Sequence, residues 1–304
     1  MFGRVLSIQS HVVHGYVGNK SAVFPLQLLG FEVDPVHSVQ FSNHTGYAKG
    51  WTGDALNGAQ LDALVEGLKR NDVVRLYTHL LTGYIGSVSF LRSVLQVHAT
   101  LKAQCPELVY FCDPVLGDKG KLYVKPELVE VYKQEVVPIA SVLTPNQFEL
   151  EMLTDSKVTD LSSAMRAFGV LHARGVRTVV LTSCEFEGQG EDALLLLASI
   201  ARPGAAPRLI QAAQPRVEGH YTGTGDLIAA LLLAWTTRKS DDMELAILRA
   251  CTTMNAVVSC TRETVVAGEN PHGELCLIQS RFAIERPDEI VDSPIDVFEI
   301  DPPS

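Results

Sequence analysis

The sequence lacks the long apolar runs and basic clusters that mark several large classes of protein. Its most apolar stretch, LIAALLLAW, is nine residues long, which is too short to cross a bilayer. Its first residues, MFGRVLSIQSHVV, carry one charge and no apolar segment of signal-peptide length. The formal net charge is −10 and no basic run occurs, so neither nucleic acid nor a membrane surface is an expected partner.

Cysteine is also sparse, and its spacing argues against a disulfide framework or a zinc site. The six cysteines are scattered along 304 residues, without a CxxC pair or the spacing of zinc ligands. Cys112, in VYFCDP, is expected to be a buried thiol on a strand. The expected compartment is the reducing cytoplasm.

Three common catalytic motifs are missing as well. No GxxxxGK[ST] occurs, which excludes a P-loop enzyme, and no GxGxxG follows the first predicted strand. A GxSxG turn is absent, which disfavours an α/β-hydrolase. Of the nine histidines, His11, His14 and His44 lie in loops expected near a pocket, and their spacing favours packing or hydrogen bonding over metal binding.

What the sequence does contain is a regular alternation of strand and helix patterns. Short β-branched runs such as RVLSIQS and ELVYFCDP are separated by helical patterns. This alternation predicts right-handed βαβ units and a mainly parallel sheet covered by helices on both faces. No long linker or repeat interrupts the chain, so we expect one three-layer α/β/α sandwich over residues 1–304.

Some segments depart from this parallel pattern. FEVDPVHSVQF is expected to be extended but interrupted by Pro35, and residues 192–200 and 208–213 are expected to form an antiparallel pair. A last strand is expected near ELCLIQS, residues 274–280, and the tail, 293–304, is expected to be a loose terminus. Two long helices are expected at residues 224–238 and 241–262.

Polar residues gather directly after the predicted strands. The segments are SHVVHG, SNHTGY, LTGY, DPVLGD, TPNQFE and TSCE, rich in Asp, Asn, Ser, Thr and Gly. In parallel α/β sheets, ligands bind beyond the carboxyl ends of the strands. The sequence therefore predicts a polar ligand site at that edge of the sheet.

The segment DPVLGD offers two carboxylates near this edge. Asp113 ends an apolar strand, and Asp118 lies five residues later, across a turn that contains Gly117. Hard cations prefer such oxygen ligands, so the pair suits Mg²⁺ or a monovalent cation bound to phosphate oxygens. The alternative is an ordinary Asp-Pro turn followed by a surface carboxylate.

The segments LTPNQFELEML and VVLTSCE allow a similar choice. Asn146 and Glu149 have the spacing of a capping box, which would explain both residues by local structure alone. A helix N-terminus also attracts anions, and Glu149 could hold a metal-bound water. Thr182 and Ser183 follow a strand and could contact phosphate or simply cap the next turn.

The segment HYTGTGDLIAALLLAW places an aspartate at the start of an apolar, hence buried, helix. Gly223 and Gly225 allow a tight turn, so the amides of residues 223–226 would point towards an anion at the helix N-terminus. A phosphoryl group that develops charge would be stabilised there. Asp226 would stay ionised and act as a general base, unless it and Thr224 merely cap the helix.

Together these segments resemble the pyridoxal kinases, a vitamin-kinase branch of the ribokinase-like superfamily. SIQSHV, QFSNHTGY and CDPVLGD are typical of this branch, whereas GTGD marks only the superfamily. With LTGY, LTPNQFELEML and VVLTS, the matching segments run in order from residue 4 to about residue 235. The resemblance implies a ribokinase-like fold.

The resemblance also implies an activity and its ligands. The expected reaction is the ATP-dependent phosphorylation of the 5′-hydroxymethyl group of pyridoxal, and of pyridoxine and pyridoxamine, in vitamin B6 salvage. The expected cofactors are Mg²⁺ or another divalent cation and K⁺ or Na⁺. The expected assembly is a homodimer. The segment GDKGKLYVKPE, with Tyr123, is a candidate flap that would exclude water.

Residue by residue, the resemblance assigns four sets of positions. Those that match the vitamer site are Ser10 and Thr45 at the ring substituents and Val17, Val39, Phe41 and Tyr84 at the apolar walls. Those that match the catalytic turn are Gly223, Thr224 and Gly225 as the anion hole and Asp226 as the base. Those that match ATP-binding positions are Asp113, Asn146, Gln147, Phe148, Glu149, Thr182, Ser183, Val217, Glu218, Gly219, Thr224 and Gly225. Those that match metal positions are Asp118 and Glu149 for Mg²⁺ and Asp113, Thr144 and Thr182 for a monovalent cation.

Two other interpretations compete with this one. A hydroxymethylpyrimidine kinase would act on another flat heterocycle with a CH₂OH group, and its anion hole would look the same. An inactive relative could bind pyridoxal phosphate or nucleotide as a carrier or sensor. SIQSHV and QFSNHTGY favour the pyridoxal reading over the first, and the presence of Asp226 argues against the second.

Overall fold

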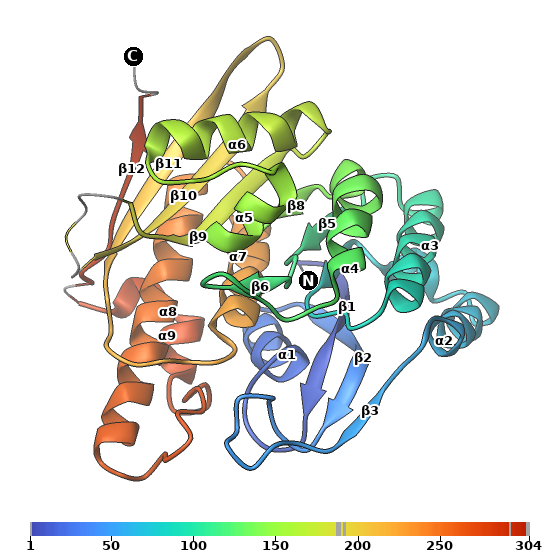
Figure 1. The fold of residues 1–304 in the computed structure, drawn as a ribbon, viewed down its shortest axis with the longest axis horizontal. Helices are drawn as coiled ribbons and strands as arrows, with labels where there is room; N and C mark the ends of the chain where they lie inside the picture. Colours follow the sequence, from blue (N-terminus) through green and yellow to red (C-terminus); the bar gives the residue numbers. More distant parts are fainter. Residues whose placement is uncertain (1, 187–189, 191–192, 292, 302–304) are drawn as a thin grey trace.

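Ten strands form the central sheet of the computed structural model, which describes residues 2–186, 190, 193–291 and 293–301 (Figure 1). Their order across the sheet is β12-β11-β10-β9-β8-β5-β4-β1-β2-β3. The bounds are β1 Arg4–Val12, β2 Glu32–Phe41, β3 Gly53–Ala55, β4 His79–Thr82, β5 Val109–Cys112, β8 Val142–Leu143, β9 Thr178–Cys184, β10 Ala193–Arg202, β11 Ala205–Pro215 and β12 Asp296–Ile300. A separate hairpin comprises β6 Gly117–Asp118 and β7 Lys121–Leu122.

Six central strands are parallel to one another, and antiparallel strands extend the sheet at both sides. The parallel pairs join β9, β8, β5, β4, β1 and β2. The antiparallel pairs are β9–β10, β10–β11, β11–β12 and β2–β3. Because the central strands are parallel, the polar segments that follow them meet at one edge of the sheet.

The helices cover both faces of this sheet. Their bounds are α1 Asn19–Leu28, α2 Gly58–Arg70, α3 Val88–Gln104, α4 Pro126–Val131, α5 Gln147–Thr154, α6 Leu161–Ala173, α7 Thr224–Arg238, α8 Met243–Val266 and α9 Arg281–Glu285. The shorter helical segments are Val74–Leu76, Tyr132–Val136, Val137–Ile139 and Pro287–Glu289. Both predicted long helices are confirmed, the second extending to Val266.

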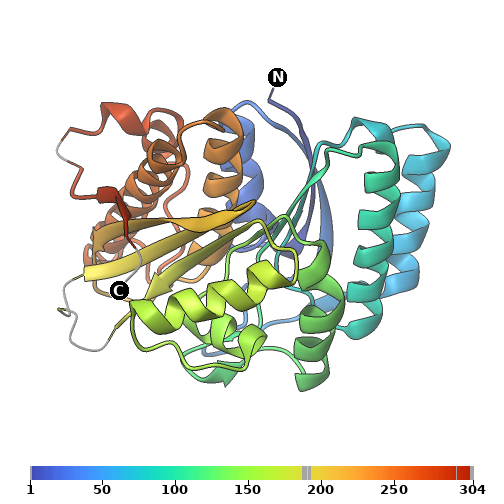
Figure 2. The same ribbon diagram turned by 90° about the horizontal axis from the view of Figure 1, so that it is seen from above.

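Two hydrophobic cores separate the layers. Figure 2 shows the helices on the two faces of the sheet from above. Helices α2 to α6 pack on one face, and α1, α7, α8 and α9 pack on the other. Strand β1 serves both, because Leu6 and Ile8 point into the first core and Val5 into the second. The predicted three-layer α/β/α sandwich with a mainly parallel sheet is confirmed.

Pro35 does not interrupt its strand, contrary to the sequence prediction. It pairs with Ser7 of β1 on one side of β2, and β3 pairs with β2 only at residues 39–41 on the other. Beside Pro35, the other side of β2 has no strand partner, so the missing N–H of Pro35 costs no ladder hydrogen bond. The strand runs unbroken from Glu32 to Phe41.

The predicted antiparallel pair of β10 and β11 is confirmed from Ala193 onward, whereas Asp192 lies outside the described residues. The last strand was predicted in the wrong place. Residues 274–276 are irregular and residues 277–280 form a turn, and Leu275 and Leu277 are buried in the second core without a strand partner. The tail, predicted to be loose, instead forms β12, which covers the edge of β11; residues 302–304 lie outside the described part.

Other local predictions hold. Cys112 is fully buried on β5, and burial raises the pKa of its thiol to about 12. Asn146 and Glu149 form the expected capping box at the start of α5. Within the described residues, no helix is both long enough and apolar enough to cross a membrane.

Candidate active site

The glycine turn before α7 leaves a row of backbone amides without partners. Gly223 has φ 91°, and a Cβ there would lie 2.2 Å from the carbonyl oxygen of Tyr16, so only glycine fits. No described group accepts a hydrogen bond from the N–H groups of residues 223–226. Residues 227–235 of α7 are buried, which fixes the helix behind the turn. The arrangement is therefore a rigid site for an anion.

Asp226 lies in the first turn of α7 and receives one hydrogen bond from a distant segment. The Gly18 N–H donates to Asp226 Oδ2 at 2.7 Å, across 208 residues of sequence. Burial raises the pKa of Asp226 to about 6, and the Gly18 hydrogen bond opposes that rise. The carboxylate is therefore ionised at neutral pH but close enough to neutrality to take up a proton.

Gly18 brings this carboxylate to the end of β1. It has φ 54°, and a Cβ there would lie 2.1 Å from the Ser10 carbonyl oxygen and 2.3 Å from Ser10 Oγ. Any side chain at this position would push the loop away from β1. The close approach thus places Ser10, a predicted vitamer ligand, near Asp226.

The predicted apolar walls come from three neighbouring strands. Val17 precedes α1 and Val39 lies on β2, and both are buried. Phe41, at the end of β2, stacks on Trp51 with ring centroids 4.0 Å apart. Tyr84 follows β4, and burial raises the pKa of its hydroxyl. Thr45, predicted to contact the ring, is exposed on the loop after β2.

Asp113 lies at the end of β5, directly beside the glycine turn. A Cβ on Gly225 would be 3.8 Å from Asp113 Oδ2, so the two chain segments are neighbours. The Thr144 hydroxyl lies 3.5 Å from Asp113 Oδ1. Burial, together with the charges of Glu149 and Asp226, raises the pKa of Asp113 well above its usual value.

Glu149 is occupied by local structure. Its Oε2 accepts the Asn146 N–H at 2.9 Å, and its Oε1 accepts those of Leu116 at 3.0 Å and Gly117 at 3.4 Å. Asn146 in turn donates from Nδ2 to the Gly117 carbonyl at 2.8 Å. Burial raises the pKa of Glu149 to about 8, although these hydrogen bonds oppose it.

Asp113, Glu149 and Asp226 form a group of buried or partly buried carboxylates that repel one another. None of them pairs with a described Lys, Arg or His. The oxygen atoms of such a group could serve as ligands for Mg²⁺ or K⁺. Within the described ranges, no three His, Cys, Asp or Glu side chains could hold a metal ion by themselves. A cation here would therefore need ligands from phosphate or water.

The remaining predicted nucleotide residues flank this group. Thr182 follows Pro145 across the sheet edge, with its N–H 3.0 Å from the Pro145 carbonyl, and Ser183 is the next residue of β9. Gln147 joins the start of α5 to Val158 and Glu185. The remaining side chain, Phe148, packs over Gly117, and a Cβ there would be 2.7 Å from its ring.

The predicted adenosine-contacting stretch leads into the glycine turn. Val217 packs on the second core, whereas Glu218 is exposed and pairs with Arg262 at 3.2 Å. Gly219 has φ 134°, and the Tyr221 hydroxyl donates to the Glu218 carbonyl at 2.5 Å. Glu218 and Gly219 are exposed, whereas Val217 is half-buried.

The candidate flap is a short hairpin on α5. Lys119 and Gly120 both have positive φ, as a two-residue hairpin turn requires. Asp118 is on β6, and Tyr123, half exposed, follows β7. Burial and the charges of Asp118 and Glu149 raise the pKa of Tyr123.

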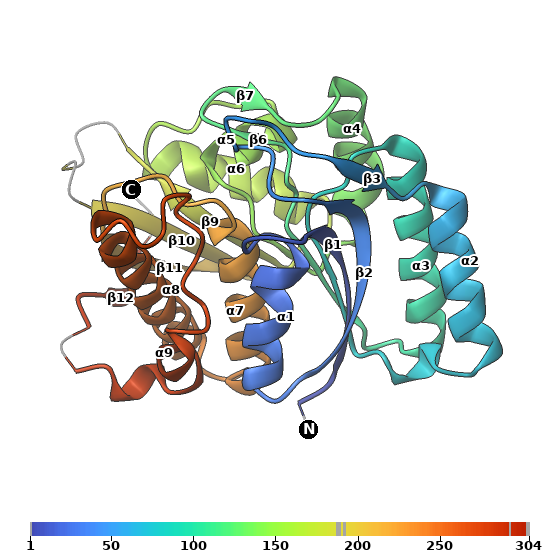
Figure 3. The same cartoon turned by 90° about the horizontal axis from the view of Figure 1, so that it is seen from below.

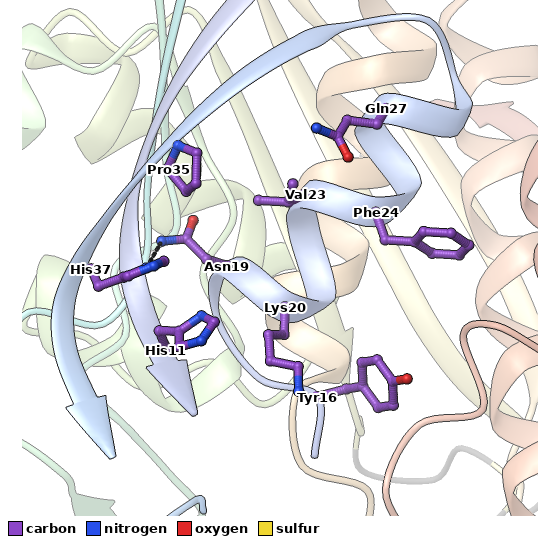
Figure 4. Close-up of a pocket in the computed structure, with 9 residues that line it drawn as sticks. All are labelled: His11, Tyr16, Asn19, Lys20, Val23, Phe24, Gln27, Pro35 and His37. Carbon is purple, nitrogen blue, oxygen red and sulfur yellow. Dashed lines mark hydrogen bonds between the residues drawn. The ribbon is translucent and has the colours of Figure 1, made fainter. Parts of the chain in front are cut away.

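A separate cavity of about 330 Å³ lies between α1 and β2 (Figure 4). It shares no residue with the predicted site. His11 and His37 face each other there with ring centroids 4.1 Å apart, and burial lowers the pKa of both. His14 and His44 instead contact the ring of Tyr47. All three predicted histidines thus pack against aromatic rings.

Fold and site together define a kinase of small molecules with the ribokinase-like architecture. A family model described as phosphomethylpyrimidine kinase matches residues 59–272. The pyridoxal kinase of Arabidopsis thaliana is 50% identical over 290 residues, covering 94% of this chain and 92% of that protein. That of Homo sapiens is 44% identical over 308 residues, covering 96% and 98%. The chain belongs to the pyridoxal kinase family.

A solved structure agrees with this assignment. The pyridoxal kinase from Leishmania donovani in complex with ADP and pyridoxine has a TM-score of 0.89 and 36% identity to this chain. The match covers 99% of this chain and 100% of that one. The chain is therefore a kinase enzyme of this family.

Proposed function

We propose that this chain transfers the γ-phosphoryl group of ATP to the 5′-hydroxymethyl group of pyridoxal, pyridoxine and pyridoxamine, in vitamin B6 salvage. The single observation that carries the proposal is the glycine turn, where four amides without a partner among the described residues lie beside the carboxylate of Asp226 at a buried helix. Relatives named pyridoxal kinase, solved with ADP and B6 vitamers, support the choice of substrates.

Asp226 takes the proton of the 5′-hydroxyl as that oxygen attacks the γ-phosphorus, while the bond from the γ-phosphorus to the bridging oxygen breaks and ADP leaves. The N–H groups of Gly223, Thr224, Gly225 and Asp226 stabilise the charge on the transferring phosphoryl group. Gly18 keeps the carboxylate aimed by its hydrogen bond. Ser10 and Thr45 hold the ring substituents, and the predicted apolar walls orient the ring.

The carboxylate group at the ends of β5 and β8 serves the nucleotide. Asp118 and Glu149 would hold Mg²⁺, and Asp113, Thr144 and Thr182 would hold K⁺ or Na⁺. The cations neutralise phosphate charge when bound. Asn146, Gln147, Phe148 and Ser183 line the phosphate side, and Val217, Glu218 and Gly219 the adenosine side. The unpaired buried carboxylates support this assignment.

A second candidate, phosphorylation of a hydroxymethylpyrimidine, is favoured by the description of the matching family model. That model begins at residue 59 and so omits β1 and the loop after β2. The part of the chain before residue 59 carries Ser10, Val17, Val39, Phe41 and Thr45, the residues that would distinguish the two heterocycles. The relatives named pyridoxal kinase match this chain over more than nine-tenths of its length, which supports the vitamin B6 substrates.

One panel of substrates tests the choice. Purified protein is incubated with ATP and each of pyridoxal, pyridoxine, pyridoxamine, hydroxymethylpyrimidine and ribose, and phosphorylated product is measured. We expect product with the three vitamers. With the other two alcohols kcat/KM should be at least tenfold lower, because the loss of specific ring contacts weakens binding of the transition state by about 1.4 kcal/mol or more. Preference for hydroxymethylpyrimidine would establish the second candidate instead.

The proposal also includes the assembly and the compartment of the protein. The family resemblance supports a homodimer. All six cysteines are free thiols, which supports a reducing compartment such as the cytoplasm.

A further inference from the structure

A buried carboxylate outside the predicted site joins three distant segments. Glu274, after α8, is 8% exposed. Its Oε2 accepts the Tyr16 N–H at 2.7 Å, and its Oε1 accepts the Tyr47 hydroxyl at 2.7 Å. His44 Nε2 lies 3.5 Å from the same Oε1. Each contact joins residues more than 220 positions apart in the sequence, so Glu274 connects the loop before α1 and the loop after β2 to the segment after α8.

The surroundings of Glu274 fix its position closely. A Cβ on Gly15 would lie 2.1 Å from Glu274 Oε2, so the loop before α1 is pressed against the carboxylate. Asn270 Oδ1 accepts the Glu274 N–H at 3.1 Å, and Asn270 Nδ2 donates to its carbonyl at 2.8 Å. His272 stacks on the Tyr47 ring at 4.3 Å. The carboxylate therefore sits at a defined point between the segments.

The first contact leads directly to the catalytic turn. The Tyr16 N–H binds Glu274, and the Tyr16 carbonyl oxygen lies where a Cβ on Gly223 would be 2.2 Å away. Two residues later, the Gly18 N–H binds Asp226. The side chain of Tyr16 instead lies beside Lys20 at the separate cavity (Figure 4), so the backbone alone makes this connection.

The second contact leads to the other vitamer-binding loop. His44 and Tyr47 lie on either side of Thr45, in the loop between β2 and β3. Burial and the hydrogen bond to Glu274 raise the pKa of Tyr47, so its hydroxyl keeps its proton and donates to the carboxylate. Hydrogen bonds to a charged acceptor are about twice as strong as neutral ones.

We infer that Glu274 is a positioning residue for the reaction proposed above, on which this inference rests. It holds the loops 13–18 and 42–47 against the glycine turn, so that the acceptor hydroxyl and Asp226 are aligned. Glu274 contacts no predicted substrate position; it acts through the Tyr16 backbone and the Tyr47 hydroxyl. Its effect therefore falls on the vitamer and on the chemical step rather than on ATP.

The test is Glu274→Gln, which keeps size and one acceptor oxygen but removes the charge. We expect kcat/KM for pyridoxal to fall about tenfold to hundredfold, as for loss of charge-assisted hydrogen bonds, with KM for ATP changed less than about twofold. The matched control is Glu269→Gln, because Glu269 lies in the same segment, is exposed and makes no side-chain hydrogen bond among the described residues. It should leave both parameters unchanged.

A second variant tests the coupling without touching the carboxylate. Tyr47→Phe removes one donor and keeps the ring that stacks on His272. We expect Tyr47→Phe and Glu274→Gln to disrupt the same interaction. The fold-decrease in kcat/KM for pyridoxal in the double variant should therefore be smaller than the product of the two single fold-decreases. Independent, multiplicative losses would overturn the inference.

The remaining outcomes are equally decisive. An unchanged kcat/KM for pyridoxal in folded Glu274→Gln would overturn the positioning role. An equal loss of kcat/KM for pyridoxal and for ATP, together with a lowered Tm, would show that Glu274 acts on stability alone. That result would also overturn the positioning role. If wild-type protein gives no product with any vitamer in the same assay, the proposed function fails first, and the inference with it.

Discussion

Two helices begin at the same edge of the sheet, each with a carboxylate in its first turn, yet the two carboxylates differ in what they bind. At α5, both oxygens of Glu149 accept backbone N–H groups nearby, and Asn146 completes the capping box. At α7, Gly223 provides no side-chain cap, and Asp226 binds only the distant Gly18 N–H. Figure 3 shows α7 beside α1, the helix that Gly18 precedes.

The difference teaches how a capping acid is told from a reactive one. An acid whose oxygens satisfy its own helix stabilises that helix and has little left to offer a substrate. An acid whose helix amides stay free sits beside an anion site and can exchange a proton. Sequence spacing alone shows an acid in the first turn of both helices.

The largest expected effect is that of Asp226→Asn. Loss of the base should lower kcat by about two or more orders of magnitude and leave ATP binding largely intact. Steady-state phosphorylation of pyridoxal and binding of ATP measure the two parts. Turnover near the wild-type rate would show that Asp226 is not the base. Asp226 would then be no more reactive than the capping residue Glu149.

The pH profile should report the same carboxylate. Burial raises the pKa of Asp226 to about 6, so its carboxyl is mostly protonated below that pH and cannot act as a base there. We expect kcat/KM for pyridoxal to fall about tenfold per pH unit well below pH 6, measured at constant ionic strength. An activity that stays level down to pH 5 would contradict the assignment.

The two glycines of the turn should respond differently to alanine. Gly223→Ala places a methyl group 2.2 Å from the Tyr16 carbonyl at positive φ, so it should lower the Tm as well as the activity. Gly225→Ala has room, with Asp113 Oδ2 3.8 Å away, so the Tm should hold while kcat falls about tenfold, from a methyl group at the phosphoryl site. Thermal melting and kinetics on both variants check this pair; equal Tm losses would contradict it.

The cation site should give a smaller effect. At fixed ionic strength, replacing K⁺ by tetramethylammonium should lower the rate severalfold, since that ion is too large for the oxygens of Asp113, Thr144 and Thr182. The matched comparison is Asp113→Asn, which should lose this response. A rate that does not depend on the cation would remove the site assignment.

The smallest expected effect is a change of stability with pH, to which Glu149 should contribute. Its carboxyl has a pKa raised to about 8 in the folded chain, so stability present at low pH is lost as pH rises through 8. The wild-type Tm should therefore drop between pH 6 and pH 9, by about 2–4 °C for each kcal/mol. The Tm of Glu149→Gln should drop less over this pH range. A drop equal to that of the wild type would contradict the raised pKa of Glu149.

Particular residues show how far the sequence could be interpreted. Asn146 and Glu149 are three residues apart, so the capping box could be predicted and is confirmed. The free amides of residues 223–226 follow from two glycines at a helix start. The lack of a strand at residues 274–280 could not be predicted, because alternating apolar residues can be buried by helix packing as well as by strand pairing.

Two residues of the candidate site escaped the sequence analysis. Gly18 was not assigned to the site from the sequence, although its N–H binds Asp226. Glu274 fell within a predicted strand, and no local motif pointed to its contacts with Tyr16 and Tyr47. The only trace in the sequence is an isolated acid in an apolar stretch, which is compatible with many structures.

The sequence by itself determined the layered α/β fold, the start of each helix at the sheet edge and the glycine turn, because these depend on residues within a few positions of one another. Only the tertiary structure decided which acid is satisfied and which is free, that the tail pairs with β11, and that Glu274 ties two loops to the turn. Those contacts join residues up to 258 apart, and the path of the chain between them sets their geometry.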